Sequence, residues 1–163
     1  MERIEHTIDP VFRTDSRVLI LGTMPSPRSR EQGFYYGHPR NRFFPVLAEV
    51  FGETVPTDVP ARKEFLLRHR VAVWDVLKSC MITGASDASI RDPVPNDLRR
   101  ILNAADIQKV YTTGTAAYRL YRGLCLPDTG MDADLLPSPS PANCRLPMED
   151  LIRSYSVIRR YTL

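Results

Sequence analysis

Short apolar runs without alternation limit the folds open to this chain. Residues 17–21, 71–75 and 109–113 each read as a strand, and residues 134–136 read as a shorter fourth strand. A continuous apolar run of this length is typical of a strand that is buried on both faces. Helical segments separate the runs, and alternating strands and helices form a parallel sheet between helical layers. The sequence therefore predicts an α/β fold, a three-layer α/β/α sandwich with a central, mainly parallel four-stranded sheet.

The predicted helices follow the apolar spacing and the caps around it. Asn41 and Asn96 are candidate N-caps, because the Asn side chain accepts a hydrogen bond from the free N–H groups of a first turn. Residues 22–40 and 81–95 are rich in residues that break regular structure and are predicted as loops. Helices are expected at about residues 41–51, 61–70, 97–104, 114–123 and 147–160.

The length and the cysteine pattern bound the organisation of the chain. Its 163 residues suffice for one hydrophobic core and show no repeat or linker, so a single domain over residues 1–163 is expected. Cys80, Cys125 and Cys144 form no C-x-x-C pair, which excludes a regular disulfide framework and a zinc or iron–sulfur spacing. No apolar run approaches the ~20 residues of a membrane span. We expect a cytoplasmic protein without a metal, a cofactor or a membrane partner.

Arginine and aromatic residues gather in one loop. The chain has 22 Lys and Arg residues, 19 of them Arg, and a formal net charge of only +3. Arg28, Arg30, Arg40 and Arg42 lie between residues 22 and 45 with one acidic residue, together with five of the fourteen aromatics. Arginines bind phosphates and aromatic faces stack on bases, so this composition is typical of a nucleic-acid site. A GC-rich genome explains the remaining arginines equally well.

The aromatic residues of this loop divide into two groups. Phe43 and Phe44 are expected to open a core helix, whereas residues 34–36, in a Gly- and Pro-rich loop, are not expected to point inward together. Acidic residues prevail between 126 and 150, so charge is polarised along the chain.

The chemistry is expected at the carboxyl ends of the strands, where ligands bind in open α/β sheets. The loop after the first strand is longer than an ordinary connection, which itself indicates function. It contains neither a Walker loop nor a dinucleotide-binding fingerprint, because Gly22 is the one glycine in residues 21–27. No carboxylate pair or metal-ligand cluster stands out in the sequence. His6 and His69 have no ligand-like partners there.

Four segments together resemble the uracil-DNA glycosylase superfamily, and within it the hypoxanthine-DNA (deoxyinosine) glycosylase family. The most specific is Phe-Tyr-Tyr-Gly-His-Pro-Arg-Asn-Arg-Phe at residues 34–43. The others are Leu-Ile-Leu-Gly-Thr-Met-Pro-Ser (19–26), Val-Trp-Asp-Val-Leu (73–77, followed by Ser79 and Cys80) and Pro-Ser-Pro-Ser-Pro-Ala-Asn (137–143). The resemblance runs from about Ile8 to Leu163, nearly the whole chain.

The resemblance implies roles for particular residues. Tyr36 falls where the pocket aromatic stacks on an extruded base, and the turn at 137–143 matches the loop that enters the duplex. Many superfamily members carry Asn or Asp at the position of Met24 to orient water; a thioether cannot do this, and Asn41 is the implied substitute. The implied base pocket comprises Gly22, Thr23, Met24, Pro25, Tyr36 and Asp75. DNA contacts are expected from Arg28, Arg40, Arg42, Ser138, Ser140, Asn143 and Arg145.

Several roles have alternatives at this point. Asn41 can serve as a helix cap as well as in catalysis, and His38 can act as a general acid or hydrogen-bond the loop backbone. Asp75 can hold a loop or take part in the pocket. The residue that enters the duplex is Ser140, Asn143 or Arg145.

The predicted function is a monofunctional DNA glycosylase of base excision repair. It would flip a deaminated base, above all hypoxanthine, out of double-stranded DNA and hydrolyse its N-glycosidic bond with water. None of the three lysines lies in the motif segments, which disfavours a Schiff-base lyase. We expect a monomer that is nucleoid-associated when acting. The alternatives are a uracil/thymine mismatch glycosylase and a non-catalytic nucleic-acid-binding module on the same fold.

Overall fold

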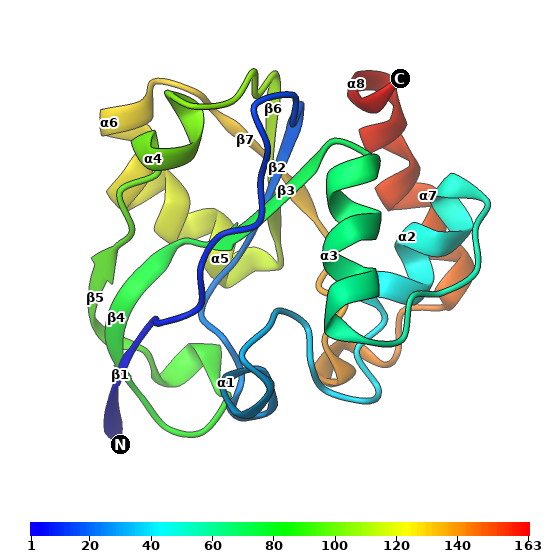
Figure 1. The fold of residues 1–163 in the computed structure, drawn as a ribbon. Helices are drawn as coiled ribbons and strands as arrows, with labels where there is room; N and C mark the ends of the chain where they lie inside the picture. The colour runs from blue at the N-terminus through cyan, green and yellow to red at the C-terminus, as the bar shows by residue number, and fades with distance from the viewer.

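The computed structural model describes residues 1–163, built around a four-stranded parallel sheet (Figure 1). In the sheet β2 pairs with β3 and β6, and β6 with β7, always in parallel. Every residue of β2 and β3 is buried, as expected for strands covered on both faces. The strands are, in spatial order, β3 (Val71–Asp75), β2 (Val18–Gly22), β6 (Lys109–Thr113) and β7 (Ala133–Leu136).

Helices cover both faces of this sheet, which confirms the predicted three-layer α/β/α architecture (Figure 1). One layer contains α2 (Phe43–Phe51), α3 (Val59–Arg68), α7 (Met148–Tyr155) and α8 (Arg159–Thr162). The other contains α4 (Arg99–Leu102), α5 (Thr115–Leu120) and α6 (Leu126–Thr129), with a π-helical turn at Tyr121–Cys125. Between them lies a continuous cluster of 36 buried hydrophobic residues. None of the helices combines the length and the apolar character that a membrane crossing requires.

A second, antiparallel sheet corrects the prediction of a loop at residues 81–95. It consists of β1 (Glu2–Glu5), β4 (Leu77–Ile82) and β5 (Arg91–Pro95), in the order β1-β4-β5. Only Val76 separates β4 from β3, so the chain passes directly from one sheet to the other. The sequence of β5 does not look like a strand, because it contains Pro93 and Pro95. An edge strand tolerates proline, since one side of its backbone is unpaired.

The loop predicted at residues 22–40 contains a short helix, α1 (Pro27–Gln32). The Ser26 hydroxyl accepts a hydrogen bond from the N–H of Ser29 and caps the helix, with Pro27 at its first position. Gly33, in the left-handed region at φ 71°, ends the helix.

Two further local predictions were wrong. Asn96 is not a helix cap: its buried amide donates to the carbonyls of Asp75 (2.9 Å) and Leu77 (3.1 Å), and α4 begins only at Arg99. Residues 34–36 do turn inward, since Phe34 and Tyr35 are buried and Tyr36 is half-buried. The reason lies in the hydroxyl of Tyr35, which donates to backbone carbonyls of the N-terminal segment and so satisfies its polar group.

Candidate active site at the carboxyl edge of the sheet

A pocket of about 330 Å³ lies where the strands of the parallel sheet end. Its walls come from the last residues of β2, β3 and β6, the loop around α1 and the turn after β7. The volume is at the lower end of the range for small-molecule sites. The structure brings together ten of the residues singled out from the sequence: Gly22, Thr23, Met24, Pro25, Tyr36, His38, Asn41, Asp75, Ser138 and Ser140.

Gly22 and Asp75 form the floor of the pocket. They are register partners at the ends of β2 and β3. A Cβ atom on Gly22 would lie 2.5 Å from Asp75 Oδ1, so only glycine leaves room for this carboxylate. The Asp75 side chain is 7% exposed, and its Oδ2 lies 2.8 Å from Nε2 of His6, which is 1% exposed.

His6 is a residue that the sequence analysis did not connect with the site. Its backbone N–H donates to the carbonyl of Lys78 (2.7 Å), which extends the pairing of β1 with β4. Its ring lies near those of Tyr35 and Trp74, at centroid distances of 5.9 and 6.3 Å. His6 is 69 residues from Asp75 in the chain, and only the unpredicted second sheet brings it there.

Tyr36 forms a wall of the pocket and adopts a left-handed backbone conformation, with φ 54°. Its ring stacks on Phe43, the first residue of α2, at a centroid distance of 3.8 Å and an interplanar angle of 12°. The hydroxyl is buried and has no hydrogen-bond partner. Burial, together with the charge of Asp75, raises the pKa of Tyr36, so the hydroxyl stays protonated.

Asn41 and His38 are held by backbone N–H groups. Asn41 Oδ1 accepts from the N–H of Phe43 (2.9 Å), and its Nδ2 makes no hydrogen bond within the protein. His38 Nδ1 accepts from the N–H of Arg40 (3.0 Å). A neutral His38 ring in this contact carries its proton on Nε2, so it can donate a hydrogen bond from that atom.

A second carboxylate, Asp87, lines the pocket together with Asp75. The Thr23 hydroxyl donates to Asp87 Oδ2 at 3.4 Å. Desolvation by the surrounding walls and the charge of Asp75 raise the pKa of Asp87 against this hydrogen bond. Thr113, at the end of β6, also lines the pocket and was not singled out from the sequence; its place at the end of a predicted strand was the available indication. Met24 contributes an apolar surface.

The turn after β7 is held in place by one hydrogen bond from α7 and by hydrogen bonds within the turn. Tyr155 donates its hydroxyl to the Pro137 carbonyl (2.7 Å), and the Asn143 amide donates to the Ser138 carbonyl (2.9 Å). The Ser140 hydroxyl accepts from the N–H of Ala142 (3.2 Å). Of Ser140, Asn143 and Arg145, only Arg145 is exposed with no side-chain partner.

The arginines expected to contact DNA divide into two kinds. Arg28, Arg40 and Arg145 are exposed, and none of their guanidinium groups has a hydrogen-bond or ion-pair partner. Arg42 is half-buried instead, and its guanidinium donates to the carbonyls of Leu146 (2.6 Å) and Asn143 (2.9 Å). Arg42 therefore braces the turn after β7 against the start of α2.

A larger groove of about 1,250 Å³ adjoins the pocket along β7, and the residues that line both are Ala85, Asp87, Ser138, Ser140 and Ala142. We place the candidate active site in the smaller pocket, because His38, Asn41 and Asp75 converge there. No three His, Cys, Asp or Glu side chains gather closely enough to hold a metal ion.

Known proteins resemble this chain over most of its length. The Uracil DNA glycosylase superfamily profile matches residues 10–150. A protein of Methanosarcina barkeri named hypoxanthine DNA glycosylase is 31% identical over 137 residues, which cover 83% of this chain and 86% of the relative. Its namesake in Methanosarcina acetivorans is 30% identical over 147 residues, which cover 87% and 90%.

A solved structure shows the same fold. The solution NMR structure of a protein proposed to be a uracil DNA glycosylase, from Methanosarcina acetivorans, superposes with a TM-score of 0.81 at 26% identity and covers 96% of both chains. The chain therefore belongs to the uracil DNA glycosylase superfamily, and it is a DNA glycosylase. Within the superfamily it belongs to the same family as the two relatives named hypoxanthine DNA glycosylase.

Proposed function

We propose that this DNA glycosylase removes hypoxanthine from deoxyinosine in double-stranded DNA, with water as the nucleophile. The observation that carries the proposal is the position of Asn41 in the pocket, with its carboxamide oriented and Nδ2 free, while Met24 occupies the place of a water-orienting residue. Both curated relatives are named for this activity. We further propose that the chain acts as a monomer with a single domain.

The target base must leave the duplex to reach the pocket. Flipping costs a few kcal/mol and costs least for a mispaired base such as hypoxanthine. Stacking on the free face of Tyr36 would return about 1–3 kcal/mol. The other face of Tyr36 is stacked on Phe43, so the ring is already fixed before the base arrives.

In this proposal Asn41 would orient the attacking water. Its Oδ1 has a second lone pair beside the one used by Phe43, and its free Nδ2 is a donor. The sugar acquires positive charge and the departing base negative charge, and fixed dipoles stabilise both without a strong nucleophile. His38 Nε2–H and the backbone amides of residues 22–25 would donate hydrogen bonds to the base.

In this proposal Asp75 would read the base. Hypoxanthine carries a ring N–H beside a carbonyl, and adenine has an unprotonated ring nitrogen at that position. A carboxylate accepts from the N–H of hypoxanthine and repels the lone pair of adenine. Uracil shares the N–H and carbonyl pair, so Asp75 alone does not separate the two deaminated bases.

The rims of the pocket would hold the DNA. The braced turn at 137–143 is rigid enough to enter the duplex, and Arg145 is the exposed side chain at its end. Arg28 and Arg40 are free to bind phosphates. No lysine lines the pocket, which favours hydrolysis by water over a Schiff-base lyase reaction.

The test uses four duplexes that carry hypoxanthine, uracil, a thymine mismatch or no lesion, followed by alkaline strand scission. We expect release of hypoxanthine at the highest single-turnover rate. Faster release of uracil or thymine would reverse the substrate assignment. Binding of the duplexes without release of any base would contradict the enzymatic function and indicate a DNA-binding module. Strand scission without alkali would contradict the monofunctional reaction.

A further inference from the structure

His6 and Asp75 form a buried pair. The proposed reaction assigns a role to Asp75 but none to His6. Nε2 of His6 and Oδ2 of Asp75 are 2.8 Å apart, and the side chains are 1% and 7% exposed. Removing such a pair from water costs free energy that the pairing does not fully return. Stability alone therefore does not explain the pair. Asp75 lines the pocket, whereas His6 contacts Asp75 but is not itself a lining residue.

The geometry fixes the orientation of the carboxylate. His6 engages Oδ2, and Oδ1 lies against Gly22, the position where a Cβ atom would stand only 2.5 Å away. The Asp75 carbonyl is held in turn by the Asn96 amide at 2.9 Å. The donor is equally rigid, because the His6 backbone N–H is bonded to the Lys78 carbonyl. Oδ2 of Asp75 is thus bound to His6, and Oδ1 lies beside Gly22 at the floor of the pocket.

The charges around the pocket indicate a second role for His6, which is to compensate the negative charge of Asp75. Two carboxylates, Asp75 and Asp87, face the pocket, and no Lys or Arg is among its lining residues. A departing base takes on negative charge, which an uncompensated carboxylate in a dry site would oppose. The hydrogen bond from His6 draws charge from Asp75 and lowers this repulsion.

We propose that His6 is a positioning residue for the glycosylase reaction: it orients Asp75 toward the ring N–H of the flipped base and compensates its charge as the base departs. This inference rests on the proposed function, in which Asp75 faces the base. A purely structural alternative is that the pair only ties the small sheet to the parallel sheet.

Two substitutions of His6 separate these readings. His6→Phe keeps a ring between Tyr35 and Trp74 but removes the donor, whereas His6→Gln supplies an amide N–H without the imidazole. We expect His6→Phe to lower the single-turnover rate on hypoxanthine about 10- to 100-fold, the loss of one charge-assisted hydrogen bond. The dissociation constant of lesion-containing DNA should change less than threefold, and His6→Gln should recover most of the rate. His69→Phe is the matched control, since His69 also pairs with a carboxylate, Glu53, but lies away from the pocket; its rate should equal that of the wild type.

A folded His6→Phe with the wild-type rate would overturn the proposal, and so would a His6→Gln as slow as His6→Phe. Should the variants not fold, ¹⁵N spectra of the wild-type imidazole decide. We expect a proton on Nε2 of His6 and a shift of its resonance on binding a hypoxanthine duplex, whereas no shift on binding would overturn the proposal. A wild type that prefers uracil would change the proposed substrate but not the role of His6. Uracil has the same N–H, so the His6 variants would show the same rate loss on uracil.

Discussion

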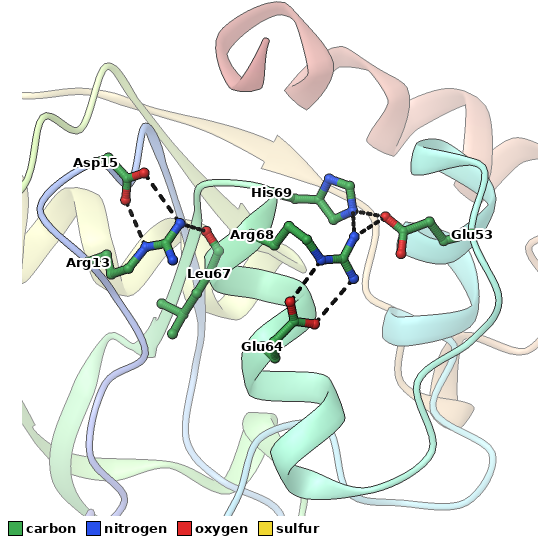
Figure 2. A network of polar contacts seen from close by, with 7 residues as sticks. All are labelled: Arg13, Asp15, Glu53, Glu64, Leu67, Arg68 and His69. Atoms are coloured by element: carbon green, nitrogen blue, oxygen red, sulfur yellow. Dashed lines mark hydrogen bonds and ion pairs between the residues drawn. The ribbon is translucent and has the colours of Figure 1, made fainter.

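The two ends of β3 carry the same chemical pair in different surroundings. At the carboxyl end, His6 and Asp75 are 1% and 7% exposed. Just before the amino end, His69 pairs with Glu53, and these side chains are 19% and 29% exposed. Figure 2 shows that Arg68 joins this second pair and also binds Glu64. Histidine and carboxylate are thus used once inside the site and once at the surface.

The difference between the two ends is one of solvation. The partly exposed network at Glu53 is open to water on one side and contributes about 0–1 kcal/mol to the free energy of unfolding. The buried pair has no water to replace a lost partner, so removing one member leaves a polar group unsatisfied. We therefore expect changes at the carboxyl end to affect activity and stability strongly, and changes at the amino end to affect stability weakly.

The largest effect is expected from Gly22→Ala. The new Cβ would displace Asp75 Oδ1 from a distance of 2.5 Å and break its contact with His6. We expect a fall in kcat/KM on hypoxanthine of at least about 100-fold, because reacting groups displaced by an ångström lose rates of this order. Gly123→Ala is the control, since nothing lies within 4 Å of its Cβ position. Equal rates for the two variants would show that the close approach at Gly22 is unimportant.

The next largest effect is a difference in the loss of stability when Asp75 and Glu53 are each replaced by alanine. Asp75→Ala leaves the buried His6 without its partner and should lower the free energy of unfolding by about 2–3 kcal/mol. Glu53→Ala should lower it by less than about 1 kcal/mol. Urea denaturation measures both, and similar losses would remove the distinction between the two ends of β3.

A smaller effect concerns DNA affinity. Arg28→Ala, Arg40→Ala and Arg145→Ala should each reduce the slope of log affinity against log salt by about 0.9, if each side chain neutralises one phosphate. Arg68→Ala, at the other end of the sheet, should leave the slope unchanged. Binding titrations on a lesion-containing duplex at several salt concentrations check this, and an unchanged slope for all three variants would move the DNA to another surface.

The smallest effect is the pH dependence of the amino-end network. The hydrogen bond from Arg68, with that from His69, lowers the pKa of Glu53. A carboxyl group with a lowered pKa stabilises the folded state above its unfolded pKa, near 4.3, and this contribution is lost as the pH falls through the folded value. The stability difference between the wild type and Glu53→Gln should thus be present at pH 6 and vanish in acid. A difference that persists in acid would exclude Glu53 ionisation as its source.

The parallel sheet was predictable because burial on both faces leaves a continuous apolar run. The strands at 71–75 and 109–113 have the predicted bounds. The small sheet was not predictable in the same way, since β5 carries two prolines and contains no buried residue. The pocket walls followed from the strand ends and the motif loops, whereas the pairing of His6 with Asp75 depends on the register of β1 with β4.

The most direct measurement of the central claim is the single-turnover rate of hypoxanthine release by two Asn41 variants. Asn41→Ala removes both the carboxamide and the acceptor for the Phe43 N–H, whereas Asn41→Ser keeps a hydroxyl acceptor for that N–H and is too short to orient water. We predict that both variants lose at least about 100-fold in rate, that Asn41→Ser keeps the wild-type melting temperature, and that Glu53→Gln keeps the full rate. A near-normal rate for Asn41→Ser would contradict the account and reduce Asn41 to a structural acceptor for the first N–H of α2, whose N-cap position is Arg42.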